Sequence, residues 1–411
     1  MRDLLFLSHR VPYPPDKGEK IRAWHFFLHL ARTHRMHLGC FLDDVSDRAH
    51  LDALRAHCAD LQVIEIDRTP QKFLSVLRAR PGKPLTLGYF SDAKLREWVE
   101  QKIAGGIDLA FVFCSAMAPY LMGAAGVRRV LDMVDVDSAK WGEYAKRSSW
   151  PARAVWAREA RTLLAFERAA AQTFERTLFV SKTEADAFLQ LAPEAADRVG
   201  WMDNGVDSST FSPAHAFAAP FADAVPCVVF TGTMDYGPNV DAVVWFADNV
   251  LPAIRARHPD IRFVIVGANP APAVRALAGG KSVVVTGRVP DVRPYLAHAA
   301  LVVAPLRIAR GIQNKILEAM AMGRPVLATP QAFAGLRAVP GRDLLVGADA
   351  AAFSALAADV LDGHHATLGA AARAAVVRDY AWDSTLAGLD ALFAPPRTKD
   401  LNTSIAHEAV P

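Results

Sequence analysis

The sequence is poor in cysteine, in long apolar runs and in net charge. Its four cysteines, in 411 residues, lack the spacing of a disulfide framework or a metal site, so we expect reduced thiols, as in a cytoplasmic protein. Its apolar runs are shorter than a transmembrane helix, and the one after Met1 is too short for a signal peptide. A net charge of +3 gives no argument for nucleic-acid binding.

Common cofactor motifs are missing as well. The loop after the first expected strand lacks G-x-G-x-x-G, which argues against a nicotinamide cofactor, and lacks G-K-[ST], which argues against a P-loop. The sequence has no grouping of His, Asp and Glu that demands a metal, so neither a metal nor another cofactor is expected. With 52% hydrophobic and 22% charged residues, the chain is typical of a globular protein of about two domains.

Strand-like and helix-like segments alternate along the chain. Strands are expected at 4–8, 36–42, 61–66, 109–113, 127–131, 177–181, 227–231, 261–266, 283–286 and 299–305. Helices are expected at 19–31, 47–57, 71–78, 92–103, 150–174, 240–258, 312–322, 353–361 and 367–378, with a last helix that ends at Phe393. This alternation predicts an α/β protein with two Rossmann-like, doubly wound halves.

The boundary between the halves is marked by an Ala/Pro-rich linker at 213–226. We expect an N-terminal, acceptor-side domain over 1–205 and a C-terminal, donor-binding domain over 206–379. A C-terminal helix at 380–394 is expected to cross back onto the first domain. Residues 395–411 are polar and without pattern, which indicates a flexible tail.

The densest set of candidate site residues follows the expected strand at 299–305. A basic loop leads to Gly311, and a helix is expected over 312–322. The backbone N–H groups and partial positive charge of a helix N-terminus bind phosphate readily. Because this end of a helix would ordinarily favour carboxylates, the cations found there indicate a bound anion. These cations are Arg307, Arg310 and Lys315.

A carboxylate accompanies these cations. Lys315 and Glu318 are three positions apart and therefore share one helix face. A phosphate-binding cation beside a carboxylate that accepts hydrogen bonds from sugar hydroxyls indicates the diphosphate and ribose of a nucleotide. The alternative is an ordinary intrahelical ion pair, which contributes little stability.

This stretch resembles the signature of retaining glycosyltransferases of the GT-B fold, in particular family four. The resemblance is carried by Glu318-Ala-Met-Ala-Met-Gly323-Arg-Pro325-Val326. The longer string Pro-Leu-Arg-x-x-x-Gly-x-x-x-Lys-x-Leu-Glu is similar to a narrower group, the exopolysaccharide sugar transferases associated with exosortase (PEP-CTERM) systems. Arg310 stands where the family carries the first Glu of its Glu pair, so the role of that position departs from the family pattern.

The resemblance implies an enzyme with two Rossmann-like domains facing a central cleft. It would move a sugar from a nucleotide-diphosphate sugar to a glycan or lipid-linked acceptor, with retention and without a metal. Arg310 and Lys315 would stabilise the leaving diphosphate as catalytic residues. The donor-binding positions implied are Gly18, Arg22, Gly232, Arg288, Val289, Arg307, Gly311 and Glu318. An ordinary βα loop is an equal alternative for the first two of these.

The loop after the strand expected at 127–131 carries three carboxylates, at Asp132, Asp135 and Asp137. Ligands of doubly wound sheets bind at the carboxyl ends of the strands. The resemblance places Asp132 where relatives often offer a His to the donor sugar, and the narrower group has an Asp-rich motif here. Asp132 and Asp135 are therefore catalytic candidates. The alternative is that the carboxylates cap the helix that starts near Ser138.

The helical pattern over 150–174 is rich in Arg and carries Trp150 and Trp156. A basic amphipathic helix with Trp is able to lie on an anionic membrane surface, which would suit a lipid-linked acceptor at the inner face of the cytoplasmic membrane. We favour the alternative, in which the helix packs across the domain boundary and its Arg side chains reach solvent.

Two other functions fit the same fold. One is a nucleotide-sugar epimerase or phosphorylase, which needs no carbohydrate acceptor, and the other is a sugar-binding homologue without activity. The cations gathered at one helix favour the transferase. The narrower resemblance implies a role for it in exopolysaccharide biosynthesis.

Overall fold

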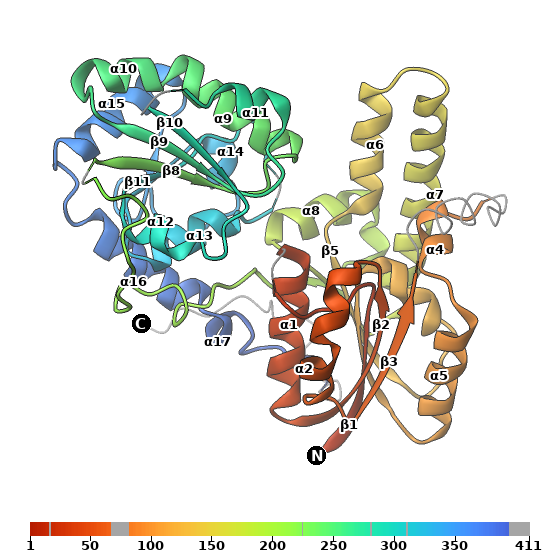
Figure 1. Ribbon diagram of the computed structural model, residues 1–411. Coiled ribbons are helices and arrows are strands. Elements are labelled where there is room, and N and C mark those ends of the chain that lie inside the picture. The colour runs from red at the N-terminus through yellow and green to blue at the C-terminus, as the bar shows by residue number, and fades with distance from the viewer. Residues whose placement is uncertain (16–17, 67–81, 224, 280–281, 310, 394–411) are drawn as a thin grey trace. The chain divides into compact units, whose positions relative to one another are not determined.

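The computed structural model describes the chain except for residues 16–17, 67–81, 224, 280–281, 310 and 394–411. The described chain forms two compact units (Figure 1). Unit 1 comprises Met1–Asp203 and the chain from Leu386, and unit 2 comprises Asn204–Thr385. The helix expected at 71–78 and the tail expected at 395–411 lie outside the described residues. Among the described helices, none is both long and apolar enough to cross a membrane.

Unit 1 is built on a sheet of seven parallel strands in the order β3-β2-β1-β4-β5-β6-β7. The central strand β4 is apolar and is buried at every residue, as expected for a parallel sheet flanked by helices. The strands are β1 (Arg2–Ser8), β2 (His34–Leu42), β3 (Asp60–Glu65), β4 (Leu109–Phe113), β5 (Arg128–Val134), β6 (Arg176–Phe179) and β7 (Val199–Trp201). The strand order reverses between β1 and β4, where doubly wound sheets bind their ligands.

The helices of unit 1 include a hairpin, made of α6 and α7, that projects beyond its other elements (Figure 1). The α-helices are α1 (Gly18–Ala31), α2 (Leu51–Arg55), α4 (Leu85–Tyr89), α5 (Ala93–Ala104), α6 (Asp137–Arg147), α7 (Ala152–Thr173) and α8 (Lys182–Leu191). The 3₁₀ helices are η1 (Val45–His50), η2 (Ser115–Tyr120), η3 (Pro193–Ala195) and η4 (Asp390–Phe393).

Unit 2 repeats the same plan with six parallel strands in the order β10-β9-β8-β11-β12-β13. The strands are β8 (Cys227–Thr231), β9 (Arg262–Val266), β10 (Val283–Gly287), β11 (Ala299–Ala304), β12 (Val326–Ala328) and β13 (Leu345–Val346). The helices are α9 (Gly237–Asn249), α10 (Leu251–Arg257), α11 (Pro272–Ala276), α12 (Arg293–Ala297), α13 (Asn314–Ala321), α14 (Pro330–Phe333), α15 (Ala350–Leu361), α16 (Leu368–Tyr380) and α17 (Trp382–Thr385). Its order reverses between β8 and β11.

Three expected helices differ from the structure. The single helix expected at 240–258 is wrong: α9 and α10 are separate, because Pro252 stands in the first turn of α10 and has no N–H to continue the ladder of α9. The helix expected at 47–57 is divided into η1 and α2. The last expected helix is short, since α17 ends at Thr385 and η4 follows five residues later.

The chain from Leu386 belongs to unit 1 and is held there by packing and by long-range hydrogen bonds, one of them between His29 Nε2 and Asp390 Oδ2 at 3.2 Å. Leu386, Leu389 and Leu392 are buried. The Arg128 guanidinium at the start of β5 donates to the carbonyl of Phe393 at 2.7 Å. The strand that leads to the Asp-rich loop is thereby tied to the end of the described chain.

Candidate functional site

In unit 2 the candidate residues gather at the carboxyl ends of β8 and β11, where the strand order reverses. Gly232 follows β8 directly, and α13 follows the loop after β11. We call Gly232, Asn239, Lys315 and Glu318 the unit 2 cluster. The sequence singled out three of these four as site residues, and the structure adds Asn239, on the first turn of α9.

The Lys315 ammonium group is fixed by its surroundings. Its Nζ donates to Asn239 Oδ1 at 2.7 Å and lies 4.2 Å from the centroid of the Phe230 ring. The Asn239 amide in turn donates to the carbonyl of Thr233 at 2.9 Å. A Cβ on Gly232 would lie 3.2 Å from Lys315 Nζ, so the ammonium stands directly over the glycine turn. The cation therefore lies beside a glycine turn, a kind of backbone segment that allows close approach of a ligand.

Lys315 and Glu318 have pKa values that converge near neutrality. Burial lowers the pKa of Lys315 to about 7, although the neighbouring Glu318 carboxylate favours the ammonium form. Burial raises the pKa of Glu318 to about 7, against the attraction of Lys315. Glu318 makes no side-chain hydrogen bond within the described part of the chain. A partly desolvated cation and a carboxylate free to accept hydrogen bonds suit a diphosphate and a sugar hydroxyl respectively.

The glycine turn depends on a second glycine that the sequence did not single out. Gly232 has a φ of 156°, in the region that favours glycine, and its N–H donates to Val266 at the end of β9. A Cβ on Gly267 would lie 1.6 Å from the Gly232 carbonyl oxygen, which only glycine avoids. The two loops therefore pack backbone to backbone under Lys315.

The basic loop before α13 is more constrained than the sequence suggested. Arg307 is paired with Asp241 on α9, with its Nε 2.9 Å from Asp241 Oδ2, and this contact raises the pKa of Arg307. Gly311 adopts the left-handed conformation, with a φ of 62°. The N-cap residue Gln313 gives the first turn of α13 no side-chain hydrogen bond. Arg310 lies outside the described residues.

The remaining donor-binding predictions fall in separate places. Arg288 is exposed and Val289 is half-buried, just after β10. Gly18 is the first residue of α1 and is exposed. Their contacts with a donor stay predictions.

Arg22 and Asp132, which the resemblance assigned to the donor, are partners of each other. Arg22 Nε donates to Asp132 Oδ2 at 2.7 Å, and a second guanidinium nitrogen donates to the carbonyl of Met202 at 2.7 Å. The exposed fractions of the two side chains are 1% and 0%. Asp132 Oδ1 accepts from the N–H of Val134 at 3.0 Å. In this structure the pair supports the loop from within, and a direct role for either residue stays a prediction.

The loop that this pair supports is strained. Val134 has a φ of 67° and Cys114 a φ of 80°, a conformation that is costly for residues other than glycine, above all for a β-branched one. The two residues stand at the carboxyl ends of the neighbouring strands β5 and β4. Two such positions at one sheet edge indicate a functional site in unit 1.

Carboxylates crowd this edge. Asp135 is exposed, yet the atoms packed around its carboxylate reduce its hydration. Together with the charges of Glu184 and Asp137, this raises its pKa to about 6. Glu184 accepts from the N–H of Val136 at 3.2 Å. Asp135 is thus able to exchange a proton near neutral pH, which fits its predicted catalytic role.

His9 is a further candidate that the sequence analysis missed. It follows β1 at the reversal of strand order, 3.9 Å from the Glu19 carboxylate, with Phe113 stacked on its ring at 6.0 Å between centroids. Burial opposes its charge, but Cys114 and Glu19 outweigh burial and raise the pKa of His9 to about 10. Its position as the first residue after a buried strand was the only signal in the sequence. We group His9, Glu19 and Cys114 with Asp135, which follows the neighbouring strand β5, under the name unit 1 cluster.

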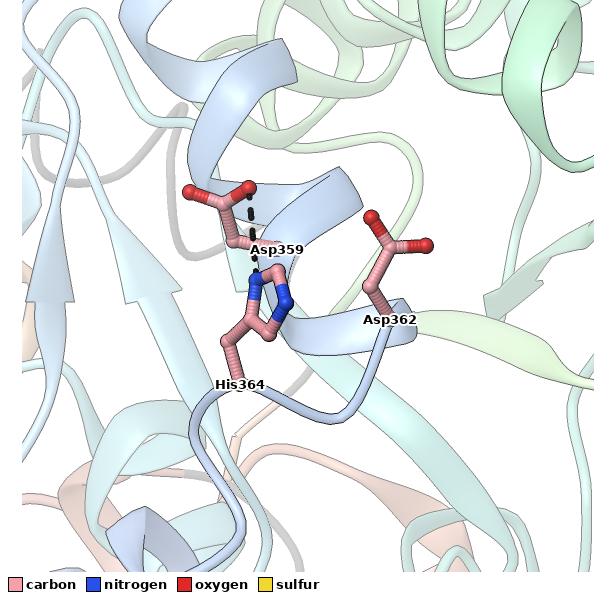
Figure 2. Close-up of side chains that lie close together, drawn as sticks. All are labelled: Asp359, Asp362 and His364. Atoms are coloured by element: carbon pink, nitrogen blue, oxygen red, sulfur yellow. Dashed lines mark ion pairs between the residues drawn. The ribbon is translucent and has the colours of Figure 1, made fainter.

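One other group of ligating residue types lies at the end of α15. The ligand atoms of Asp359, Asp362 and His364 lie within 4.8 Å of one another, and His364 Nδ1 faces Asp359 at 3.9 Å (Figure 2). Asp362 is also paired with Arg257 and lies 3.3 Å from His258. Because basic side chains already surround the carboxylates, we interpret the group as a surface charge network.

A known protein family matches part of the chain. Residues 225–362 match the family model described as "Glycosyl transferases group 1". The match spans β8 to the end of α15 and includes every residue of the unit 2 cluster. The match therefore lies within unit 2. No curated protein sequence matches the chain.

Solved structures resemble the chain over almost its whole length. Anabaena Alr3699/HepE in complex with UDP and glucose has a TM-score of 0.67 at 16% identity, over 96% of this chain and 99% of that one. Sucrose-phosphate synthase from Thermosynechococcus elongatus has a TM-score of 0.65 at 18% identity, over 96% of this chain and 98% of that one. WaaG, a glycosyltransferase involved in lipopolysaccharide biosynthesis, has a TM-score of 0.64 at 15% identity, over 95% of this chain and 100% of that one. At these identities the likeness concerns the fold, and the predicted GT-B fold is confirmed.

Proposed function

We propose that the chain is a retaining glycosyltransferase that moves a sugar from a nucleotide-diphosphate sugar to a glycan or lipid-linked acceptor. The observation that carries the proposal is the Lys315 ammonium, held over the Gly232 turn by Asn239 and Phe230. It lies inside the segment that matches the glycosyl transferases group 1 model. A solved structure of the same fold, HepE, has been determined with UDP and with UDP-glucose, which supports a nucleotide-sugar donor.

The chemistry follows from where charge develops. As the bond between the sugar and the diphosphate breaks, negative charge grows on the diphosphate, and fixed donors at that point lower the barrier. Lys315, the backbone N–H groups at the start of α13 and the basic loop would supply them. Glu318 would accept hydrogen bonds from the ribose hydroxyls. We assign the unit 1 cluster to the acceptor, with Asp135 as a group that receives or returns a proton.

The finer assignment rests on the sequence resemblance. The string from Pro305 to Glu318 and the Asp-rich loop are similar to the exopolysaccharide sugar transferases of exosortase systems. We therefore propose a role in exopolysaccharide biosynthesis, on the cytoplasmic side of a membrane that holds the acceptor. Retention would follow if the acceptor attacks on the same face of the sugar from which the diphosphate leaves. The leaving phosphate would then help to remove the proton from the acceptor hydroxyl.

The test is donor turnover. Purified protein is incubated with a panel of UDP-, GDP- and ADP-sugars, and the released nucleoside diphosphate is measured. One donor is expected to be turned over, and Lys315→Met and Glu318→Gln are each expected to lower its kcat/KM at least about tenfold. Arg255→Met, a cation of unit 2 that is exposed on α10, is the matched control and is expected to keep full activity.

Other outcomes distinguish the alternatives. Interconversion of sugars without release of nucleoside diphosphate would indicate an epimerase. Donor binding without turnover, with every acceptor offered, would indicate a sugar-binding homologue. With an acceptor in hand, the anomeric configuration of the product, read by NMR, tests retention directly.

A further inference from the structure

We propose that the tip of the α6–α7 hairpin docks the protein on an anionic phospholipid surface. The hairpin tip is defined here as residues 144–155, from the last turn of α6 to the first turn of α7. The inference goes beyond the proposed glycosyl transfer and does not depend on it, because the features that carry it lie away from both candidate clusters.

The first observation is apolar exposure. Trp150 is 83% exposed, the highest fraction of the large hydrophobic side chains in the described chain. Tyr144 and Val155 are exposed at 45% and 43%. Of the ten exposed large hydrophobic residues in the described part of the chain, three thus fall within twelve positions. Trp and Tyr at such a site fit the interface between water and lipid, where one end of the ring is apolar and the other is wet.

The second observation is charge. Residues 140–161 hold six cationic and two acidic side chains, a net charge of +4, while the whole chain has +3. Of the two acids, Glu159 is buried and accepts from the backbone of Leu85 and Thr86, so it faces inward. Lys146 and Arg153 are exposed within the tip. Cations around exposed aromatic rings complement a surface of anionic lipid rather than a neutral one.

The third observation is that the tip stands out and is held firmly. Figure 1 shows α6 and α7 projecting beyond the rest of unit 1. The rings of Trp141 and Trp156 stack at 4.9 Å between the two helices. At the base, the Ser138 hydroxyl donates to Glu167 at 2.5 Å. A rigid projection presents its tip to a flat surface without losing much conformational entropy.

The position of the hairpin relates docking to the proposed acceptor site. α6 begins at Asp137, two residues after Asp135, and its eleven residues extend for about 16 Å. A surface bound at the tip therefore lies within a few helical turns of the Asp-rich loop. If the acceptor is lipid-linked, this distance would suit it, but only this last step rests on the proposed function.

The experiment measures binding to vesicles without any sugar donor. Protein is sedimented with vesicles of phosphatidylcholine alone, or with about 30% phosphatidylglycerol, at about 0.1 M and about 0.5 M salt. We expect binding only to the anionic vesicles, weakened by salt. Trp150→Ala is expected to lower the partition coefficient about tenfold. The double variant Lys146→Gln with Arg153→Gln is expected to lower it about fivefold for each cation removed. Leu191→Ala and Arg48→Gln, at exposed positions of unit 1 outside the tip, are the controls.

A second readout places the tip in the bilayer. Brominated lipids are expected to quench tryptophan fluorescence of the wild type, and Trp150→Phe is expected to remove most of that quenching while binding persists. Equal binding by wild type and tip variants, or binding independent of anionic lipid, would overturn the proposal. So would a dimer that Trp150→Ala dissociates without change in vesicle binding, since the tip would then contact a second copy. Donor turnover of the same variants in solution is measured separately, so a failure of the proposed function is seen independently.

Discussion

The Arg22 guanidinium lies 2.7 Å from the Asp132 carboxylate, across 110 positions of sequence, and both side chains are almost fully buried. α1 contributes the cation and β5 the anion. The second donor of Arg22 reaches the carbonyl of Met202, close to the end of unit 1. One buried ion pair thus joins the helix after β1, the strand before the Asp-rich loop and the segment that leaves the unit.

Removing one member of this pair should be more harmful than removing both. Arg22→Met is expected to destabilise the protein by about 3–5 kcal/mol, because it leaves Asp132 as a buried, unpaired charge. Arg22→Met with Asp132→Asn is expected to recover at least half of that loss, since the amide still accepts from Val134. The free energy of unfolding in denaturant measures both. Arg2→Met, at the exposed Arg2–Asp108 pair, is the control and should cost less than about 1 kcal/mol. Additive effects at Arg22 and Asp132 would contradict the argument.

Lys315 should couple nucleotide binding to pH. Its pKa is about 7 in the free protein, because burial disfavours its charge. A diphosphate binds the protonated ammonium. Above pH 7, Lys315 must therefore take up a proton when UDP binds, and the affinity for UDP falls by up to about tenfold per pH unit. Calorimetry in two buffers of different ionisation enthalpy measures the proton directly.

Two variants separate Lys315 from its neighbour. Lys315→Met is expected to bind UDP at least about tenfold more weakly, with no proton uptake linked to this residue. Glu318→Gln removes the carboxylate that favours the ammonium form, so the pH at which affinity starts to fall should move below 7. An unchanged pH profile in Lys315→Met would refute the assignment.

Gly267 should tolerate no side chain. Gly267→Ala would place a Cβ 1.6 Å from the Gly232 carbonyl oxygen, so the glycine turn would have to move. We expect a loss of about 1–3 kcal/mol in stability and a larger loss of UDP affinity than of stability. Gly237→Ala is the matched control in the same unit, because a Cβ there meets nothing within 4 Å. Thermal unfolding and UDP titration measure the two effects, and similar behaviour of both variants would contradict the close approach.

Glu167 should make stability depend on pH. Burial raises its pKa to about 8, although the hydrogen bonds from Ser138 oppose the shift. Between the ordinary value of about 4.3 and 8, the native state holds a proton that the unfolded chain has released. Its contribution to stability is therefore present at acidic pH and is lost as the pH rises through this window.

Glu167→Gln tests that sign. Its amide oxygen accepts from the Ser138 N–H at any pH, so the loss of unfolding free energy between about pH 5 and pH 8 should shrink by about 2 kcal/mol or more. Denaturant unfolding at the two pH values measures the difference. Glu100→Gln, at an exposed position on α5, should leave the wild-type slope unchanged. A steeper slope in Glu167→Gln would show that the carboxyl is ionised in the native state.

The sequence by itself determined the architecture. Apolar runs that alternate with helical patterns predicted two doubly wound halves. Strands that are buried on both faces consist of continuous apolar residues, so they are recognised in the sequence. β4 and β8 begin and end where they were expected. The order of elements in 304–329 was also predicted from the sequence, since strand, basic loop, glycine, helix and strand follow one another within a single βαβ unit. The break at Pro252 was visible in the sequence and was missed.

Only the tertiary structure decided which side chains meet. Lys315 and Asn239 are 76 positions apart, and Arg22 and Asp132 are 110 apart; parallel strands bring each pair to one sheet edge. Whether a cation faces a ligand or a buried carboxylate is set by that packing, which local pattern does not encode. The same holds for Gly267, whose need for glycine arises from the backbone of another loop. Local periodicity fixes the elements, whereas contacts between distant elements fix the site.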